Sequence, residues 1–125
     1  MVDIAVIDWD EAMEQCGGDE EFLIELLGDL QEELETQVRK IGVALLDPVK
    51  LMAIRSAAHV VKGAAANLMC EDLRSTSADL EQVAKNNTDK PIDSEVKGAL
   101  ESKYEKLKEA TEKYKEFVKT IPVDN

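Results

Sequence analysis

The chain contains a single histidine, His59, and three residues spaced around it could support nucleophilic chemistry. An imidazole is substantially neutral near pH 7, and its free ring nitrogen is then a nucleophile toward phosphorus. Lys62 and Arg55 lie three and four residues away, which in a helix places their cations on the turns next to the ring. There they could stabilise the charge of a phosphorylated imidazole. Gly63, four residues after His59, would give a partner's backbone room to approach the ring.

A helical arrangement of residues 51–68 would turn His59 away from the hydrophobic core. At about 3.6 residues per turn, the apolar positions of this stretch fall in one arc almost opposite His59. They are Leu51, Ile54, Ala57, Val61, Ala65 and Leu68. The arc around His59 is instead basic and low in relief, and we expect His59 and Lys62 to carry the chemistry. Met52 lies on the same arc, and a partner would dock on its other residues: Arg55, Ser56, Gly63, Ala66 and Asn67.

Gly, Pro and Asn divide the chain into a short lead-in and four long helical stretches. In the lead-in, Asp8 or Asp10 could cap a short helix that ends near Cys16, before Gly17-Gly18. Asp19 is a good N-cap for the first long helix, and acidic residues follow it in the first turn, where the helix dipole favours them.

Three more helices are predicted. Pro48 suits the first turn of the helix that runs to about Leu68, because proline lacks an N–H that a first turn leaves unpaired. Another helix spans about 71–85, and the last begins at Ser94 after a polar loop. In all four long helices the apolar or small positions recur every three or four residues. Outside 51–68 they are Leu23, Leu27, Leu30, Leu34, Val38, Ile41, Leu45, Leu73, Thr76, Ser77, Leu80, Val83, Ala84, Leu100, Tyr104, Leu107, Thr111, Tyr114, Val118 and Ile121.

These amphipathic helices predict an all-α fold, an antiparallel four-helix bundle with a short N-terminal lead-in helix. We expect one domain over residues 1–125, with the lead-in at 1–18 and the bundle at 19–121. Ile4, Ile7 and Trp9 would cover one end of the bundle.

The amino-acid composition excludes some classes of binding partner. The formal charge of -12 repels nucleic acid and anionic membranes, and no segment is long and apolar enough to cross a membrane. Cys16 and Cys70 lack metal-ligand spacing and are typical of reduced thiols. We therefore expect a cytoplasmic protein, or a nuclear one if the source is eukaryotic, and a monomer.

The run from His59 to Leu68, HVVKGAAANL, resembles the signature H-x-x-K-G-[SA]-[SA]-x-N-[LIF] of histidine-containing phosphotransfer domains. The stretches 8–23 and 79–84 resemble the lead-in and the following helix of that family. The resemblance implies phosphoryl exchange between the histidine and aspartates of receiver domains in hybrid histidine kinases and response regulators. It implies no cofactor of this chain's own, since Mg²⁺ belongs to the receiver. The family commonly has glycine where this chain has Met69, so the turn there could be built differently.

Other functions remain as alternatives. A non-covalent adaptor could bind a receiver domain without phosphotransfer. A di-metal carboxylate bundle needs Glu-x-x-His pairs on two helices, which one histidine cannot provide. The sequence has no Walker-type or kinase motif for ATP-dependent activity. The chain could be a piece of a hybrid kinase, although Met1 favours a free-standing carrier. The acidic run Glu32, Glu33 and Glu35 predicts a solvated helix face or, less commonly, a partner contact.

Overall fold

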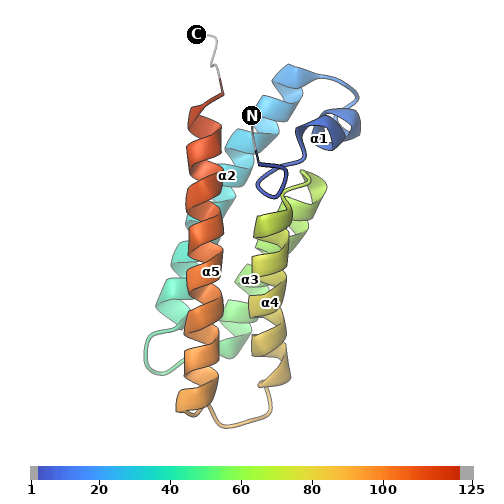
Figure 1. Cartoon of the computed structure of the whole chain (residues 1–125). Helices are drawn as coiled ribbons and strands as arrows, with labels where there is room; N and C mark the ends of the chain where they lie inside the picture. Colours follow the sequence, from blue (N-terminus) through green and yellow to red (C-terminus); the bar gives the residue numbers. More distant parts are fainter. Residues whose placement is uncertain (1–2, 122–125) are drawn as a thin grey trace.

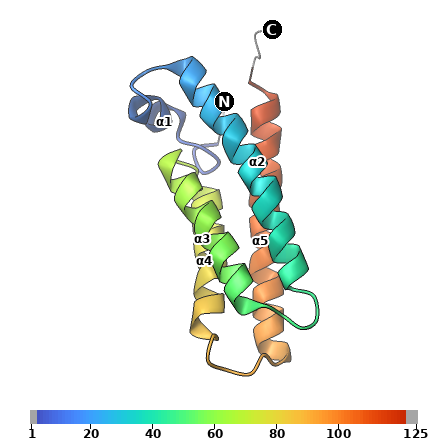
Figure 2. The same cartoon turned by 180° about the vertical axis from the view of Figure 1, so that it is seen from behind.

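A computed structural model describes residues 3–121, and these form five helices and no strand. A short helix, α1 (Trp9–Gln15), precedes four long ones: α2 (Glu20–Ala44), α3 (Leu51–Asn67), α4 (Glu71–Asn86) and α5 (Ser94–Lys119). The long helices alternate in direction, and α1 lies across the end where α3 meets α4 (Figures 1 and 2). The predicted all-α, antiparallel four-helix bundle with a lead-in helix is confirmed.

Aspartate side chains start three of the helices. Asp8, Asp19 and Asp93 each accept a hydrogen bond from the backbone N–H three residues later, at 3.2, 3.1 and 2.9 Å. These bonds satisfy donors that the first turn of a helix leaves without a partner. Of the two caps predicted for the lead-in helix, Asp8 and Asp10, the structure uses Asp8, and the predicted starts at Asp19 and Ser94 agree with the structure.

The start of α3 differs from the prediction. Pro48 lies in a loop, and α3 begins at Leu51. The backbone N–H of Lys50 donates to the carbonyl of Ala44, 2.9 Å away, at the end of α2. This bond satisfies a terminal carbonyl of α2, and it requires the chain between the two residues to fold back as a loop.

A tight turn joins α3 to α4 around Met69. The N–H groups of Met69 and Cys70 donate to the carbonyls of Ala66 and Ala65, at 3.3 and 2.9 Å, which is the Schellman pattern. Met69 has a φ of 59°, in the left-handed region that glycine favours. The turn thus has the geometry that suits the family's glycine, although methionine occupies the position.

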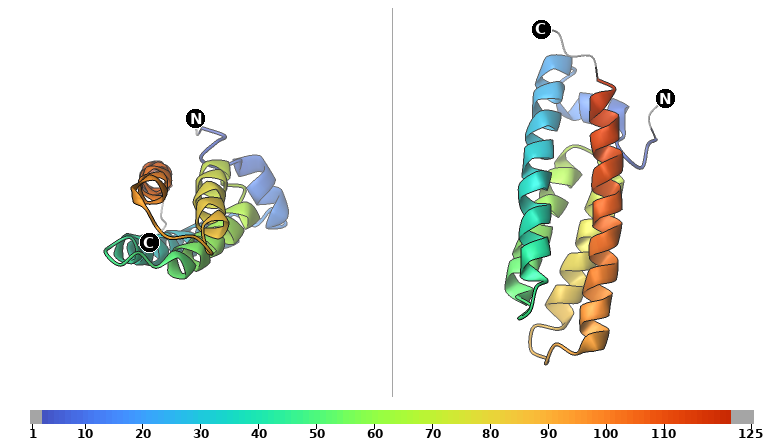
Figure 3. Two further views of the ribbon diagram at one scale, coloured as in Figure 1. Left: turned by 90° about the horizontal axis from the view of Figure 1, so that it is seen from below. Right: turned by 90° about the vertical axis from the view of Figure 1, so that its left-hand side faces the viewer.

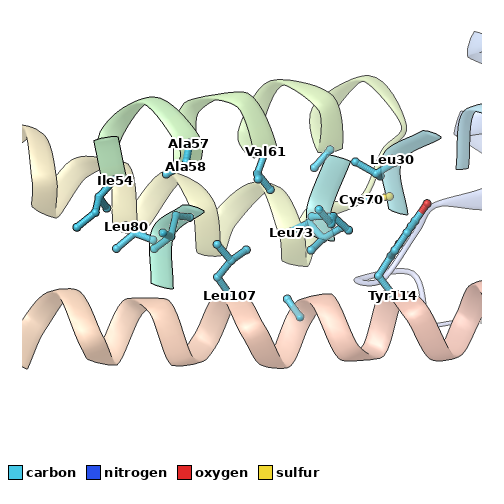
Figure 4. Close-up of a cluster of buried hydrophobic side chains, with 14 of the residues drawn as sticks. Leu30, Ile54, Ala57, Ala58, Val61, Cys70, Leu73, Leu80, Leu107 and Tyr114 are labelled. Carbon is cyan, nitrogen blue, oxygen red and sulfur yellow. The ribbon is translucent and has the colours of Figure 1, made fainter. Parts of the chain in front are cut away.

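The core lies between the inward faces of the four long helices. Every residue of the predicted inward arc of α3 is buried, and the side chains of Ile54, Ala57 and Val61 point toward α4 and α5 (Figure 4). Tyr114 is fully buried, and its hydroxyl donates to the carbonyl of Leu27, 2.6 Å away, joining α5 to α2. These two helices run side by side along the length of the bundle (Figure 3).

The lead-in covers the upper end of the bundle with different residues than expected. Ile7 is fully buried and Trp9 packs edge-on against Phe117, but Ile4 is 68% exposed, so its predicted place in the cover is wrong. The carbonyl of Ala5 accepts the N–H of Asp72, 2.8 Å away, which anchors the segment to the start of α4. Ile4 lies in the turn before this anchor and faces solvent.

Two predictions from composition concern the cysteines and membrane-spanning helices. Both cysteines are free thiols, with Cys70 buried and Cys16 half-buried. Burial raises the pKa of the Cys70 thiol to about 12. Among the described residues, no helix is long and apolar enough to span a membrane.

Candidate functional site

His59 lies on the solvent side of α3. Its side chain is 67% exposed, whereas Val61 and Ala65 on the opposite face are fully buried. The helical wheel therefore gave the right orientation, because the small and apolar residues of α3 pack against the neighbouring helices. The ring is held on a rigid element and remains accessible to a partner.

Glu81 of α4 contacts both His59 and Lys62. One carboxylate oxygen lies 2.7 Å from Nδ1 of His59, and the other lies 2.5 Å from Nζ of Lys62. The side chain of Glu81 is only 15% exposed, so the two contacts replace much of its hydration. A single carboxylate thus fixes the positions of two side chains that are one turn apart on α3.

The charge of Glu81 determines which ring nitrogen is free. Partial burial raises the pKa of Glu81, but the hydrogen bonds from Lys62 and His59 outweigh this effect and hold the pKa below its usual range. Because an ionised carboxylate can only accept hydrogen bonds, the contact requires the proton on Nδ1. In the neutral ring the lone pair is then on Nε2, which is the nitrogen not engaged by Glu81.

The surroundings of His59 are positively charged. We call the hollow between α3 and α4 the His59 cleft; its lining residues are Met52, Arg55, Ser56, His59, Val60, Lys62, Glu81, Gln82 and Lys85. Three of them are cations, Arg55, Lys62 and Lys85, against one carboxylate. Such a cleft favours an anionic group at Nε2, because its cations would face the added charge.

The structure divides the predicted docking residues among different surfaces. Arg55 and Ser56 line the His59 cleft, whereas Asn67 lines a neighbouring groove between α2 and α3. Gly63 and Ala66 are exposed on α3 but line neither hollow. A Cβ at Gly63 would meet nothing within 4 Å, so no packing within the described chain requires a glycine there.

Comparison of the chain with models of known protein families identifies its family. The family model described as "Hpt domain" matches residues 25–110, which is more than half of the chain. The chain belongs to the Hpt domain family. Membership of this family implies a role in phosphorelay histidine phosphotransfer in two-component signalling. In these systems Hpt domains act as phosphocarriers and interact with receiver domains.

A solved structure supports the fold of this Hpt domain. The Hpt domain of the Hpt sensor hybrid histidine kinase from Shewanella superimposes with a TM-score of 0.72, covering 97% of this chain and all of that one. The two sequences are 18% identical, so the likeness concerns the fold alone. Comparison with proteins of curated function yields no match.

Sequence reasoning missed the part of this Hpt domain site that comes from α4: Glu81, Gln82 and Lys85. The sequence feature that could have revealed these residues is the short connection around Met69. In an antiparallel helix pair with a tight turn, residues at equal distances before and after the turn lie level with each other. His59 lies ten residues before Met69 and Glu81 twelve after it, within about one helical turn of the same level.

Proposed function

We propose that His59 accepts a phosphoryl group from the aspartyl phosphate of one receiver domain and passes it to the aspartate of another. The observation that carries this proposal is the contact between Nδ1 and Glu81, which leaves the exposed Nε2 as the nucleophile. An exposed ring on a helix suits a carrier, because two different partners must reach it in turn.

The transfer step needs no additional general base from this chain. The lone pair of Nε2 forms the N–P bond as the P–O bond to the receiver aspartate breaks, and that electron pair leaves with the carboxylate. The ring becomes an imidazolium whose proton stays on Nδ1, where Glu81 stabilises it. In onward transfer an aspartate oxygen attacks phosphorus, and Nε2 regains its electron pair.

Lys62 and Gly63 have separate parts in this proposal. The ammonium of Lys62 is bound to Glu81 in the resting state and lies one turn from His59, within reach of phosphoryl oxygens on the ring. Gly63 leaves the surface beside the ring low, so that a receiver can approach closely. The receiver supplies Mg²⁺ and its carboxylates, and this chain acts as a carrier without ATP-dependent kinase activity of its own.

The decisive experiment incubates the chain with a receiver domain that has been phosphorylated by acetyl phosphate and Mg²⁺. We expect an acid-labile, base-stable label on the wild type and none on His59→Gln, with the same circular dichroism spectrum for both. A label retained by His59→Gln would refute the assignment of the acceptor. Binding without any label on the wild type would instead support the non-covalent adaptor.

Gly63→Gln tests the clearance beside the ring. We expect it to weaken receiver affinity and transfer together, because a long side chain obstructs approach, although it improves helix propensity. Gly98→Gln is a matched control, since Gly98 is also an exposed helical glycine whose added Cβ would meet nothing within 4 Å. Equal behaviour of the two variants would mean that Gly63 has no role in docking.

A further inference from the structure

Two cations of the His59 cleft have no carboxylate partner. Arg55 of α3 is half-buried and Lys85 of α4 is exposed, and both line the cleft. Neither forms an ion pair with another residue in the range 3–121. Lys62 differs, because its ammonium lies 2.5 Å from the carboxylate of Glu81. Arg55 and Lys85 are therefore the cleft cations that an added anion could bind without breaking an ion pair.

Arg55 and Lys85 lie at the same level of the cleft. Arg55 precedes His59 by four residues, and Lys85 follows Glu81 by four. Because α3 and α4 are antiparallel neighbours (Figure 1), both steps run in the same direction, about 6 Å along the bundle from the contact between His59 and Glu81. Lys62 follows His59 and so lies toward the other end of α3. Two cations from different helices thus meet at one level, one helical turn from the ring.

The direction of the His59 side chain favours this side of the ring. Side chains on a helix lean toward its N-terminus, so the ring extends over the turn that contains Arg55. A guanidinium on a long side chain reaches a neighbouring turn and binds two phosphoryl oxygens at once. Lys62, by contrast, must share its ammonium with Glu81.

The charge of the cleft matches that of a phosphoryl group. Its three cations and one carboxylate leave an excess of two positive charges when the ring is neutral. A phosphoryl group brings about 1.5 to 2 negative charges near pH 7. While a receiver is docked, its Mg²⁺ neutralises much of this charge. After the receiver leaves, the cations of this chain must do so alone.

We propose that Arg55 and Lys85 bind the phosphoryl group of the free carrier and thereby set how far exchange with a receiver proceeds toward phosphohistidine. This proposal rests on the proposed function, since it assumes phosphorylation of His59. In the exchange, the N–P bond at Nε2 forms as the P–O bond to the receiver aspartate breaks. Cations that stabilise the N-phosphoryl product shift this equilibrium toward the carrier.

The equilibrium constant of the exchange separates this role from docking. It compares the free proteins before and after transfer, so contacts that exist only in the complex do not change it. The test labels a receiver with acetyl phosphate and Mg²⁺, removes the acetyl phosphate and mixes the receiver with this chain. The labelled fraction of each protein is read at the plateau, which is approached from both directions. Protein concentrations are kept well below the docking Kd.

The variants are Arg55→Gln, Arg55→Lys and Lys85→Gln. Arg39→Gln and Lys106→Gln are matched controls, because both residues are exposed cations outside the cleft, on α2 and α5. Circular dichroism and thermal melting check the fold of each variant. Since Lys85 is exposed, its variant tests the proposal even if replacement of the half-buried Arg55 disturbs the fold.

We expect Arg55→Gln and Lys85→Gln each to lower the equilibrium constant about fivefold, with both controls unchanged. Arg55→Lys should lower it less, since lysine keeps the charge but not the planar fork. Unchanged constants in both glutamine variants, or equal effects in the controls, would overturn this proposal and leave the proposed function intact. A change confined to the half-saturating receiver concentration would also overturn it, because the two residues would then act in docking. If the receiver does not label the wild type, both proposals fail.

Discussion

Lys62 combines a contact in the resting state with a proposed role in the reaction. Its ammonium contacts Glu81, and it lies one turn from the ring of His59 on the same face of α3. Phosphorylation of the ring would bring new negative charge near the ammonium, so Lys62 would share its hydrogen bonds between Glu81 and the phosphoryl oxygens.

We expect Lys62→Ala to slow transfer by roughly 10 to 100-fold, about 1.4 to 2.7 kcal/mol of transition-state stabilisation, with receiver affinity little changed. Rapid quench gives the rate, and titration gives the affinity. Lys106→Ala, an exposed lysine on α5, serves as the control. Loss of affinity with a normal maximal rate would assign Lys62 to docking instead.

Glu81 should make the stability of the fold depend on pH. Because the pKa of Glu81 is lower in the folded chain, its stabilising effect is present above the unfolded value, near about 4.3, and is lost as the pH falls through the folded value. We expect Glu81→Gln to lower the free energy of unfolding by about 1 kcal/mol at neutral pH, since its bonds are partly exposed to solvent. Urea denaturation of both proteins across acidic pH should show this difference shrinking. A difference of equal size at acidic and neutral pH would contradict the role of the charge.

At this scale the sequence predicted the orientation of His59 but not its partner. Periodicity within α3 was enough to place the ring opposite Val61, because burial follows from the helix period. The contact with Glu81 depends on how α3 and α4 align, which periodicity within either helix does not contain. The pairing becomes visible only when the turn around Met69 is taken as a tight antiparallel connection.

The helices themselves were largely predictable from caps and apolar spacing. Asp8, Asp19 and Asp93 begin their helices as aspartate caps do, and this signal is local in the sequence. The helix start predicted at Pro48 was wrong, because proline suits the first turn of a helix and a loop equally well. The bond between Lys50 and Ala44, which decides the matter, spans the connection between two helices.

Met69 provides a test of the turn between α3 and α4. A left-handed conformation costs a residue with a Cβ roughly 1 to 2 kcal/mol, and glycine avoids this cost. Met69→Gly and Met69→Ala both lose the packing of the methionine side chain, but only glycine relieves the backbone. We expect Met69→Gly to be about 1 kcal/mol more stable than Met69→Ala in urea denaturation. Equal stabilities would mean that the turn relaxes in the variants.

Across the whole molecule, the lead-in connects the turn near the site to the far helix. The N–H of Asp8 donates to the carbonyl of Met69, 3.0 Å away, while Trp9 packs against Phe117 of α5. The sequence correctly placed a lead-in over the bundle but not its individual residues. Ile4 and Ile7 are equally apolar, and the backbone bonds of Ala5 and Asp8, which lie on either side of the inward-facing Ile7, are not visible in the sequence.

We expect Ile7→Ala to lower the free energy of unfolding by about 2 to 4 kcal/mol, because it removes a fully buried side chain between the lead-in and the bundle. Ile4→Ala should change it by less than about 0.5 kcal/mol, since Ile4 is exposed. Chemical denaturation of both variants measures the difference. Similar losses in the two would show that Ile4 is buried in solution.

The turn around Met69 also has a consequence for divergence among relatives. His59, Lys62 and Glu81 all lie on the single helical hairpin of α3 and α4, within one short stretch of the chain. For the proposed transfer step, α2 and α5 need only supply apolar positions at helical spacing, a requirement that many sequences meet. Mutations can therefore accumulate in these two helices while the hairpin keeps its chemistry. Overall identity, such as the 18% with the Shewanella domain, then says little about whether two chains share a reactive centre.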